Sequence, residues 1–346
     1  MESIGSPLVW SLFAAFVVAA LAVDFFAMRR QGAHAVSMKE AGVWSAIWVA
    51  VSFVFVGWLW WHLGGTSGDP AREALANAKA LEFATGYLIE KALAVDNIFV
   101  FLMVFTYFAV PAAYQKRVLM IGILGALVLR AGMILVGAWL IEQFHWILYV
   151  FGAFLLFTGI KMWWAAGQEP DLGSNPALNF IRRRMKISPE YDGERFFTVQ
   201  GGVRMATPLF VVILLIGVVD IVFAVDSIPA IFAITRDPFI VLTSNVFAIL
   251  GLRAMYFLLA GMHERFHLLS YGLAIVLGFI GIKMLLIDVY KIPVAASLGF
   301  TVLVLAATMI LSLRIPPRPG KSTGGAYPFA PKAGAVGTER APDAAK

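Results

Sequence analysis

The chain has 346 residues, of which 60% are hydrophobic and 14% charged, and its mean hydropathy is +0.83. A soluble domain carries about 45–50% apolar and about 25% charged residues, so this composition excludes a soluble globular protein and indicates an integral membrane protein. The net charge of +6 then reports which loops face the cytoplasm rather than nucleic-acid binding. Because the chain has no cysteine, structural disulfides, thiolate metal sites and cysteine nucleophiles are excluded.

Apolar segments recur along the chain, each near the about 20 residues that a helix needs to cross the hydrocarbon. The sequence predicts an all-α polytopic membrane protein with nine spans, at 8–27, 42–62, 82–107, 118–141, 146–165, 206–232, 239–260, 268–287 and 293–313. We divide it into 1–81 with helices 1 and 2, 82–165, a basic cytoplasmic loop at 166–204, 205–287, helix 9 at 288–314, and a tail at 315–346. The tail is rich in Pro, Gly and Ala, so we expect it to be disordered.

Basic residues concentrate in alternate loops. With the N-terminus outside, the loops on the cytoplasmic side hold Arg29, Arg30 and the run Arg182 to Arg184, whereas the outer loops hold few basic residues. Cytoplasmic loops carry an excess of Lys and Arg, so the pattern predicts an N-terminus outside and a C-terminus inside a bacterial inner membrane.

Two acidic stretches repeat each other. EKALAVDN at 90–97 and DIVFAVDS at 220–227 share the pattern acid-x-x-x-Ala-Val-Asp-polar, and GIKM at 159–162 recurs at 281–284. Helices 3 to 5 are therefore predicted to repeat as helices 6 to 8. A unit of three spans reverses direction, so this is a 3+3 inverted repeat, which in transporters places the substrate site near the bilayer midplane.

Acids inside spans 3 and 6 predict a functional site, because each charge at a helix centre costs roughly 2.5 to 3.5 kcal/mol. The expected metal ligands are Glu90, Asp96, Asn97, Asp220, Asp226 and Ser227. Possible supporting residues are Asp24, Arg130, Asn245 and Arg253. Residues seven apart share a helix face, as Glu90 and Asn97 do, and Asp220 and Ser227. The inverted repeat also predicts that Glu90 lies level with Asp226, and Asp96 with Asp220.

Carboxylate, amide and hydroxyl oxygens are hard ligands, which favour Mn, Mg or Ca over Zn or Cu. The structural alternative is an ion-pair network of the four acids with Lys91, Arg130 and Arg253. Glu82, at the outer start of span 3, is expected in solvent.

The stretches GYLIEKALAVDNIFVF and AVDSIPAIFAITRDPFIVLTSNVFAILGLRAMYF resemble the signature segments of the TerC family, in its Alx-like branch, and the resemblance runs from Leu81 to Leu286. It implies an inverted-repeat transporter related to the LysE superfamily, associated with manganese export and metal ion homeostasis and, by name, with tellurium resistance. By resemblance, the family's intramembrane acids and polar motif positions fall on Glu90, Asp96, Asp220, Asp226, Asn97 and Asn245. Gly217 stands where the family often has a further acid.

The resulting prediction is a transporter that exports divalent cations, Mn²⁺ above others, by alternating access. It is not an enzyme and uses no cofactor; its partners are the cation and the lipid bilayer, with the oligomeric state open. One alternative is an intramembrane aspartyl protease with a dyad of two aspartates. Another is a non-transporting membrane partner of stress-response or membrane-insertion factors, working through the 166–204 loop.

Overall fold

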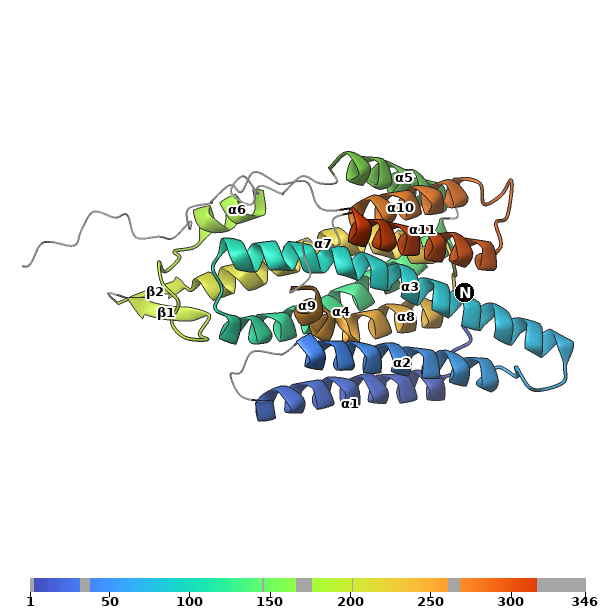
Figure 1. The fold of residues 1–346 in the computed structure, drawn as a ribbon, viewed down its shortest axis with the longest axis horizontal. Coiled ribbons are helices and arrows are strands. Elements are labelled where there is room, and N and C mark those ends of the chain that lie inside the picture. The colour runs from blue at the N-terminus through green and yellow to red at the C-terminus, as the bar shows by residue number, and fades with distance from the viewer. Residues whose placement is uncertain are drawn as a thin grey trace, which may run out of the picture.

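The structure is a computed structural model that describes residues 3–31, 38–144, 146–165, 176–200, 202–260 and 268–315. In order, they form α1 (Pro7–Gln31), α2 (Met38–His62), α3 (Pro70–Tyr107), α4 (Ala112–Gln143), α5 (Ile147–Ala165), α6 (Pro176–Arg184), β1 (Phe197–Gln200), β2 (Val203–Ala206), α7 (Pro208–Phe232), α8 (Pro238–Leu250), α9 (Leu252–Ala260), α10 (Leu269–Leu285) and α11 (Val294–Arg314). Helices α5, α10 and α11 lie along one edge, α1 and α2 along the opposite edge, and α3, α4, α7 and α8 between them (Figure 1). The predicted disordered tail, beyond its first residue, lies outside the described residues.

Several of these helices can cross a membrane. Within the described chain, five are long and apolar enough, and a sixth is added if α8 and α9 form one bent span. The five are Met38–His62, Ala113–Gln143, Ile147–Trp164, Pro208–Phe232 and Val294–Arg314. The apolar parts Pro7–Val23 and Leu269–Leu285 are shorter. A multi-pass membrane protein is therefore confirmed, while the count of nine spans stays a prediction.

Helix α3 begins well before the predicted start at residue 82. Asp69 caps it by accepting a hydrogen bond from the Ala71 N–H at 3.0 Å, and Pro70 occupies the first helical position, where a missing N–H costs nothing. With 38 residues the helix is about 57 Å long, against about 30 Å of hydrocarbon. Its first turns consequently project beyond the neighbouring helices (Figure 1).

The predicted continuous span at 239–260 is broken. Helices α8 and α9 meet at Gly251 with a bend of 42°. Lys91 of α3 reaches this break and donates to the Ala248 carbonyl at 3.2 Å. A Cβ on Gly251 would lie 2.6 Å from Lys91 Nζ, so the lysine as placed lies directly against this glycine.

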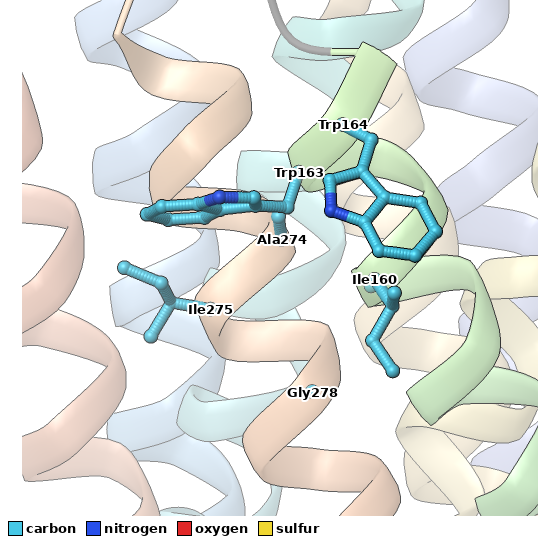
Figure 2. A pocket seen from close by; sticks show the side chains of 7 residues that line it. Ile160, Trp163, Trp164, Ala274, Ile275 and Gly278 are labelled. Carbon is cyan, nitrogen blue, oxygen red and sulfur yellow. The ribbon is translucent and has the colours of Figure 1, made fainter.

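Helices α5 and α10 pack with their backbones in contact. A Cβ on Gly159 would lie 2.8 Å from the Ala274 oxygen and the Gly278 nitrogen, and one on Gly281 would lie 2.6 Å from the Leu156 nitrogen. These glycines therefore let the two helices pack closely, as small residues do at many membrane helix interfaces. An apolar cavity of about 300 Å³ borders this glycine seam, between Trp163 and Trp164 on one side and α10 on the other (Figure 2).

The predicted loop at 166–204 contains regular structure in its described part. Helix α6 is followed by the antiparallel hairpin β1–β2, in which Phe197 pairs with Ala206. The Tyr191 hydroxyl donates to the Phe108 carbonyl at 2.7 Å, and Arg117 bridges Glu194 at 2.8 Å. Burial raises the pKa of Tyr191, so its hydroxyl stays a donor well above neutral pH. These contacts hold the loop against the ends of α3 and α4.

Candidate functional site

Glu90 of α3 and Asp220 of α7 are acids within the apolar core. Their residues are 1% and 4% exposed, and their helices pack side by side. Their neighbours along the same helices are buried and apolar. They are Ile89 and Leu93 near Glu90, and Ile216 and Ala224 near Asp220. An unpaired ionised carboxylate in such surroundings costs several kcal/mol or more, so each of these acids needs a counter-charge or ligand.

Arg130 of α4, only 3% exposed, supplies that counter-charge. Its Nη1 contacts Glu90 Oε1 and donates to Ser227 Oγ at 3.4 Å, and its Nη2 lies 3.6 Å from Asp220 Oδ1. Asn97 completes the group: with its amide nitrogen donating to the Leu93 carbonyl, its oxygen accepts from Arg130 Nη2 at 3.3 Å. One guanidinium thus joins side chains from α3 and α7.

The predicted shared helix faces are confirmed. Glu90 and Asn97 meet Arg130 from α3, and Asp220 and Ser227 meet it from α7. Residues seven apart differ by only about 20° around a helix. Arg130, which the sequence left between charge balance and a direct role, lies at the centre.

The predicted pairing of the acids by level stays a prediction, and the described contacts group these acids in another way. Asp226 lies about 120° around α7 from Asp220. It accepts a hydrogen bond from Thr158 of α5 at 3.2 Å, while Asp220 shares Arg130 with Glu90. Which acids share a contact here depends on where each side chain lies around its helix and on how far the arginine side chain reaches. The two aspartates of α7 therefore contact different helices.

The structure describes the side chains of only some of the remaining predicted residues. The side chains of Asp24 and Asp96 lie outside the described part, although both residues are in helices α1 and α3. Asn245 of α8 is 1% exposed, and Arg253 is half-buried in α9. Among the side chains that are described, no three of the types His, Cys, Asp and Glu are grouped closely enough to hold a metal ion.

Some buried polar atoms of the predicted site residues are unpaired. Asp220 Oδ2 and both amide atoms of Asn245 have no hydrogen-bond partner in the described chain. Most buried polar atoms in native proteins are paired, so these atoms mark acceptor and donor capacity that the fold itself does not use. Oxygen acceptors of this type suit a hard cation.

Comparison with known proteins shows the family of this chain. The model of the family described as "Integral membrane protein TerC family" matches residues 75–319. The chain belongs to the TerC family. Within it, the chain is 54% identical over 325 residues to "Putative membrane-bound redox modulator Alx" of Escherichia coli K12, covering 94% of this chain and 100% of that protein.

Two other relatives are named only as membrane proteins. "Uncharacterized membrane protein STKORF319" of Myxococcus xanthus is 48% identical over 90% of this chain and 93% of its own length. "Uncharacterized membrane protein" of Rickettsia bellii is 37% identical over 88% of this chain and 96% of its own length. No solved structure matches the chain.

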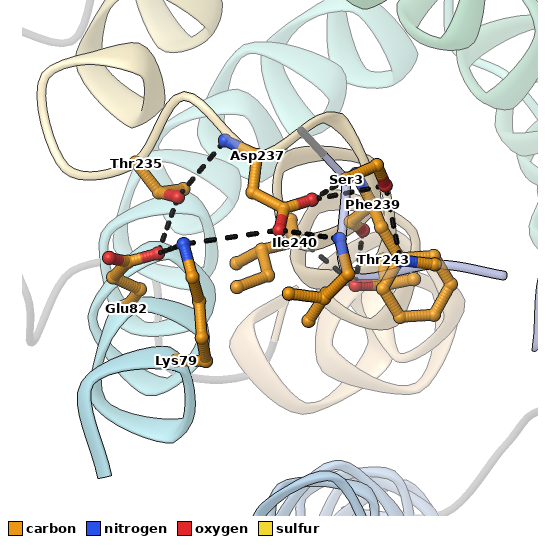
Figure 3. A network of polar contacts seen from close by, with 10 residues as sticks. Ser3, Lys79, Glu82, Thr235, Asp237, Phe239, Ile240 and Thr243 are labelled. Carbon is orange, nitrogen blue, oxygen red and sulfur yellow. Dashed lines mark hydrogen bonds and ion pairs between the residues drawn. The ribbon is translucent and has the colours of Figure 1, made fainter. Parts of the chain in front are cut away.

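The TerC chain has a second polar network, which the sequence did not predict. Lys79 Nζ lies 2.9 Å from Glu82 and 3.9 Å from Asp237, and the Thr235 hydroxyl donates to Glu82 at 2.6 Å (Figure 3). These residues line a cavity of about 380 Å³. Asp237 also accepts from the Ile4 N–H at 3.1 Å, which ties the start of the chain to α8.

Glu82 is therefore not in free solvent, contrary to the expectation from the sequence. Its side chain is 15% exposed and bound from two sides. One sequence signal could have indicated this network. Asp237 before Pro238 is typical of a helix N-cap followed by proline at the first helical position, and it marks the start of α8.

Proposed function

We propose that this TerC protein exports a divalent cation, above all Mn²⁺, across the bacterial inner membrane by alternating access. The observation that carries the proposal is the convergence of Glu90 and Asp220 from two helices within the apolar core. Ionisable residues held inside a membrane protein mark ion pathways far more often than packing. Asp220 Oδ2 has no hydrogen-bond partner among the residues that the structure describes, which leaves it available to a cation.

The 3+3 inverted repeat is part of this proposal. If α3 to α5 and α7 to α10 are related by a two-fold axis in the membrane plane, contacts between them should occur in exchanged pairs. Helix α3 packs on α8 and α4 on α7, while α5 packs on α10. This reciprocity supports two related halves with the site at their interface, where transporters of this type bind substrate.

The choice of metal follows from ligand chemistry and family. Glu90, Asp220, Asn97 and Ser227 offer oxygen only, which suits Mn²⁺, Mg²⁺ and Ca²⁺. The resemblance to TerC manganese exporters selects Mn²⁺ among them and sets the outward direction. In this proposal Asp226 and Asp96 join the coordination when the halves rearrange.

The Alx relatives carry a name that refers to redox modulation. This chain has no cysteine, so thiol–disulfide exchange is not a route open to it. A transporter that sets the level of a metal ion needs no reactive thiol.

The test is Mn²⁺ efflux from cells that lack their own exporters and carry Glu90→Gln or Asp220→Asn. Each variant keeps the side-chain shape and removes one charge. We expect efflux to fall roughly 10- to 100-fold, the usual cost of disturbing a metal-coordinating group. Glu194→Gln, in which the replaced acid is 49% exposed, is the matched control and should behave as wild type. Wild-type efflux in both site variants, at equal protein levels, would contradict the proposal.

A further inference from the structure

We propose that Arg130 is a resident cation that the transported metal displaces, and that it thereby makes the site selective for divalent over monovalent cations. This inference rests on the proposed function and assigns a specificity role at the same site. It starts from an overlap: the side chains that Arg130 contacts, Glu90, Asn97, Asp220 and Ser227, are the donors offered to the metal. Guanidinium and metal therefore cannot use these oxygens together.

Charge balance favours an exchange. The two carboxylates together carry a charge of −2. One guanidinium compensates half of this charge, whereas one divalent ion compensates all of it. In a low-dielectric interior an uncompensated charge is costly, so a divalent cation has an advantage over Arg130 on these two carboxylates. The displaced guanidinium stays charged, so the exchange requires that it turns to another acceptor as the metal binds. A monovalent cation has the same charge as Arg130, must give up its hydration shell, and gains nothing by replacing it. After the metal leaves, the arginine prevents the bare carboxylates from repelling each other.

The contacts on the α7 side are those of a group that can leave. Strong charge-assisted hydrogen bonds measure about 2.7–2.9 Å and arginine–carboxylate pairs are frequently bidentate. Arg130 Nη2 instead lies 3.6 Å from Asp220 Oδ1 and its Nη1 lies 3.4 Å from Ser227 Oγ, whereas its close contact is with Glu90 on the α3 side. Its Nε, also buried, has no hydrogen-bond partner in the described chain. A permanently structural buried arginine is expected to have its donors satisfied.

The test compares purified wild type, Arg130→Gln and Arg130→Lys by Mn²⁺ titration in detergent, with and without high Na⁺. For Arg130→Gln we expect Kd to fall about tenfold or more, equivalent to about 1.4 kcal/mol of relieved competition. High Na⁺ should weaken Mn²⁺ binding in that variant and leave wild type unaffected. Arg130→Lys keeps the charge and should retain the wild-type resistance to Na⁺. A merely structural arginine would give the opposite, weaker Mn²⁺ binding in Arg130→Gln.

Arg117→Gln is the matched control, because Arg117 lies on the same helix in an exposed ion pair. It should change neither the Kd nor the Na⁺ response. Wild type supplies a measurement that does not depend on the folding of a variant: in a structure of the Mn²⁺-loaded protein, Arg130 should have left Asp220 and Ser227. Bound Mn²⁺ with these contacts intact would overturn the inference.

The outcomes separate the two proposals. If wild type binds Mn²⁺ and Arg130→Gln binds it equally or more weakly, the resident-cation role is wrong and the export function stands. If only Arg130→Gln binds Mn²⁺, the competition is stronger than proposed and the role is supported. If neither variant nor wild type binds a divalent ion, the proposed function fails and this inference fails with it.

Discussion

Asp226 shows how the position of an acid around its helix decides its partner in the membrane. It directly precedes Ser227 in the sequence, yet Arg130 contacts Ser227 and Asp220, and Asp226 accepts a hydrogen bond from Thr158 on α5. The side chain is only partly buried. It therefore links α7 to α5 in the present state and remains the acid of α7 that is not tied to the guanidinium.

Replacing Thr158 by valine tests this link. Thr158→Val keeps the shape and removes the donor, so we expect the free energy of unfolding to fall by about 1 kcal/mol, within the range for interhelical hydrogen bonds in membranes. The measurement is thermal or SDS-induced unfolding of the purified protein. Thr106→Val is the control, because the exposed Thr106 hydroxyl bonds only the Leu102 carbonyl of its own helix. Equal losses in both variants would mean that the Asp226 contact adds no stability.

At this scale the sequence predicted the acids better than their partners. The seven-residue spacing placed Glu90 with Asn97 and Asp220 with Ser227, because helical periodicity fixes which side chains share a face. It did not assign Arg130 the central place. A long flexible side chain can reach several neighbours, and which one it reaches depends on how three helices pack.

At the scale of the element, glycine decides how closely α5 and α10 approach. Both Gly159 and Gly281 would place a Cβ within 2.8 Å of backbone atoms of the opposite helix. Backbone atoms cannot move aside as a flexible side chain can, so even one methyl group forces the helices apart.

We expect Gly159→Ala to lower the free energy of unfolding by about 1–3 kcal/mol, the usual cost of overpacking. The measurement is again unfolding in detergent. Gly132→Ala is the matched control, since nothing lies within 4 Å of a Cβ at Gly132 on α4. It should leave stability unchanged or slightly higher, because alanine favours the helix. A tolerant Gly159→Ala would show that the seam can open without cost.

Helix existence was predicted well and helix boundaries less well. Apolar length marks a span, but the extension of α3 to Pro70 depends on the Asp69 cap in a polar segment. The break between α8 and α9 escaped prediction because Leu250 and Leu252 continue the apolar run on both sides of Gly251. A tertiary contact accompanies the break, since Lys91 of α3 lies against Gly251 and donates to the Ala248 carbonyl.

At the scale of the whole molecule, the two ends of the helix bundle differ. Helix α6 and the β-hairpin lie at one end, and the first turns of α3 project at the other (Figure 1). The hairpin and α6 belong to the basic segment that the sequence places in the cytoplasm. The loop after α10, with Val289 83% exposed, belongs to a segment that it places outside.

The orientation can be measured by single cysteines, because the chain has none of its own. We expect a membrane-impermeant maleimide to label Val289→Cys in cells with a permeable outer membrane. Val199→Cys, at a residue 68% exposed in β1, should react only after the inner membrane is opened. Both variants should react fully in lysed cells. The reverse pattern would invert the proposed orientation.

The glycine seam also limits how the protein can change shape. If α5 slid along α10, carbonyl oxygens of one helix would collide with the backbone of the other. The two helices can therefore tilt against each other at the seam but cannot slide. The seam lies at one edge of the molecule, beyond the central helices that carry Glu90 and Asp220 (Figure 1). A tilt of α5 against α10 at this seam would therefore move the central helices, and it would move α1 and α2 at the opposite edge (Figure 1) still further.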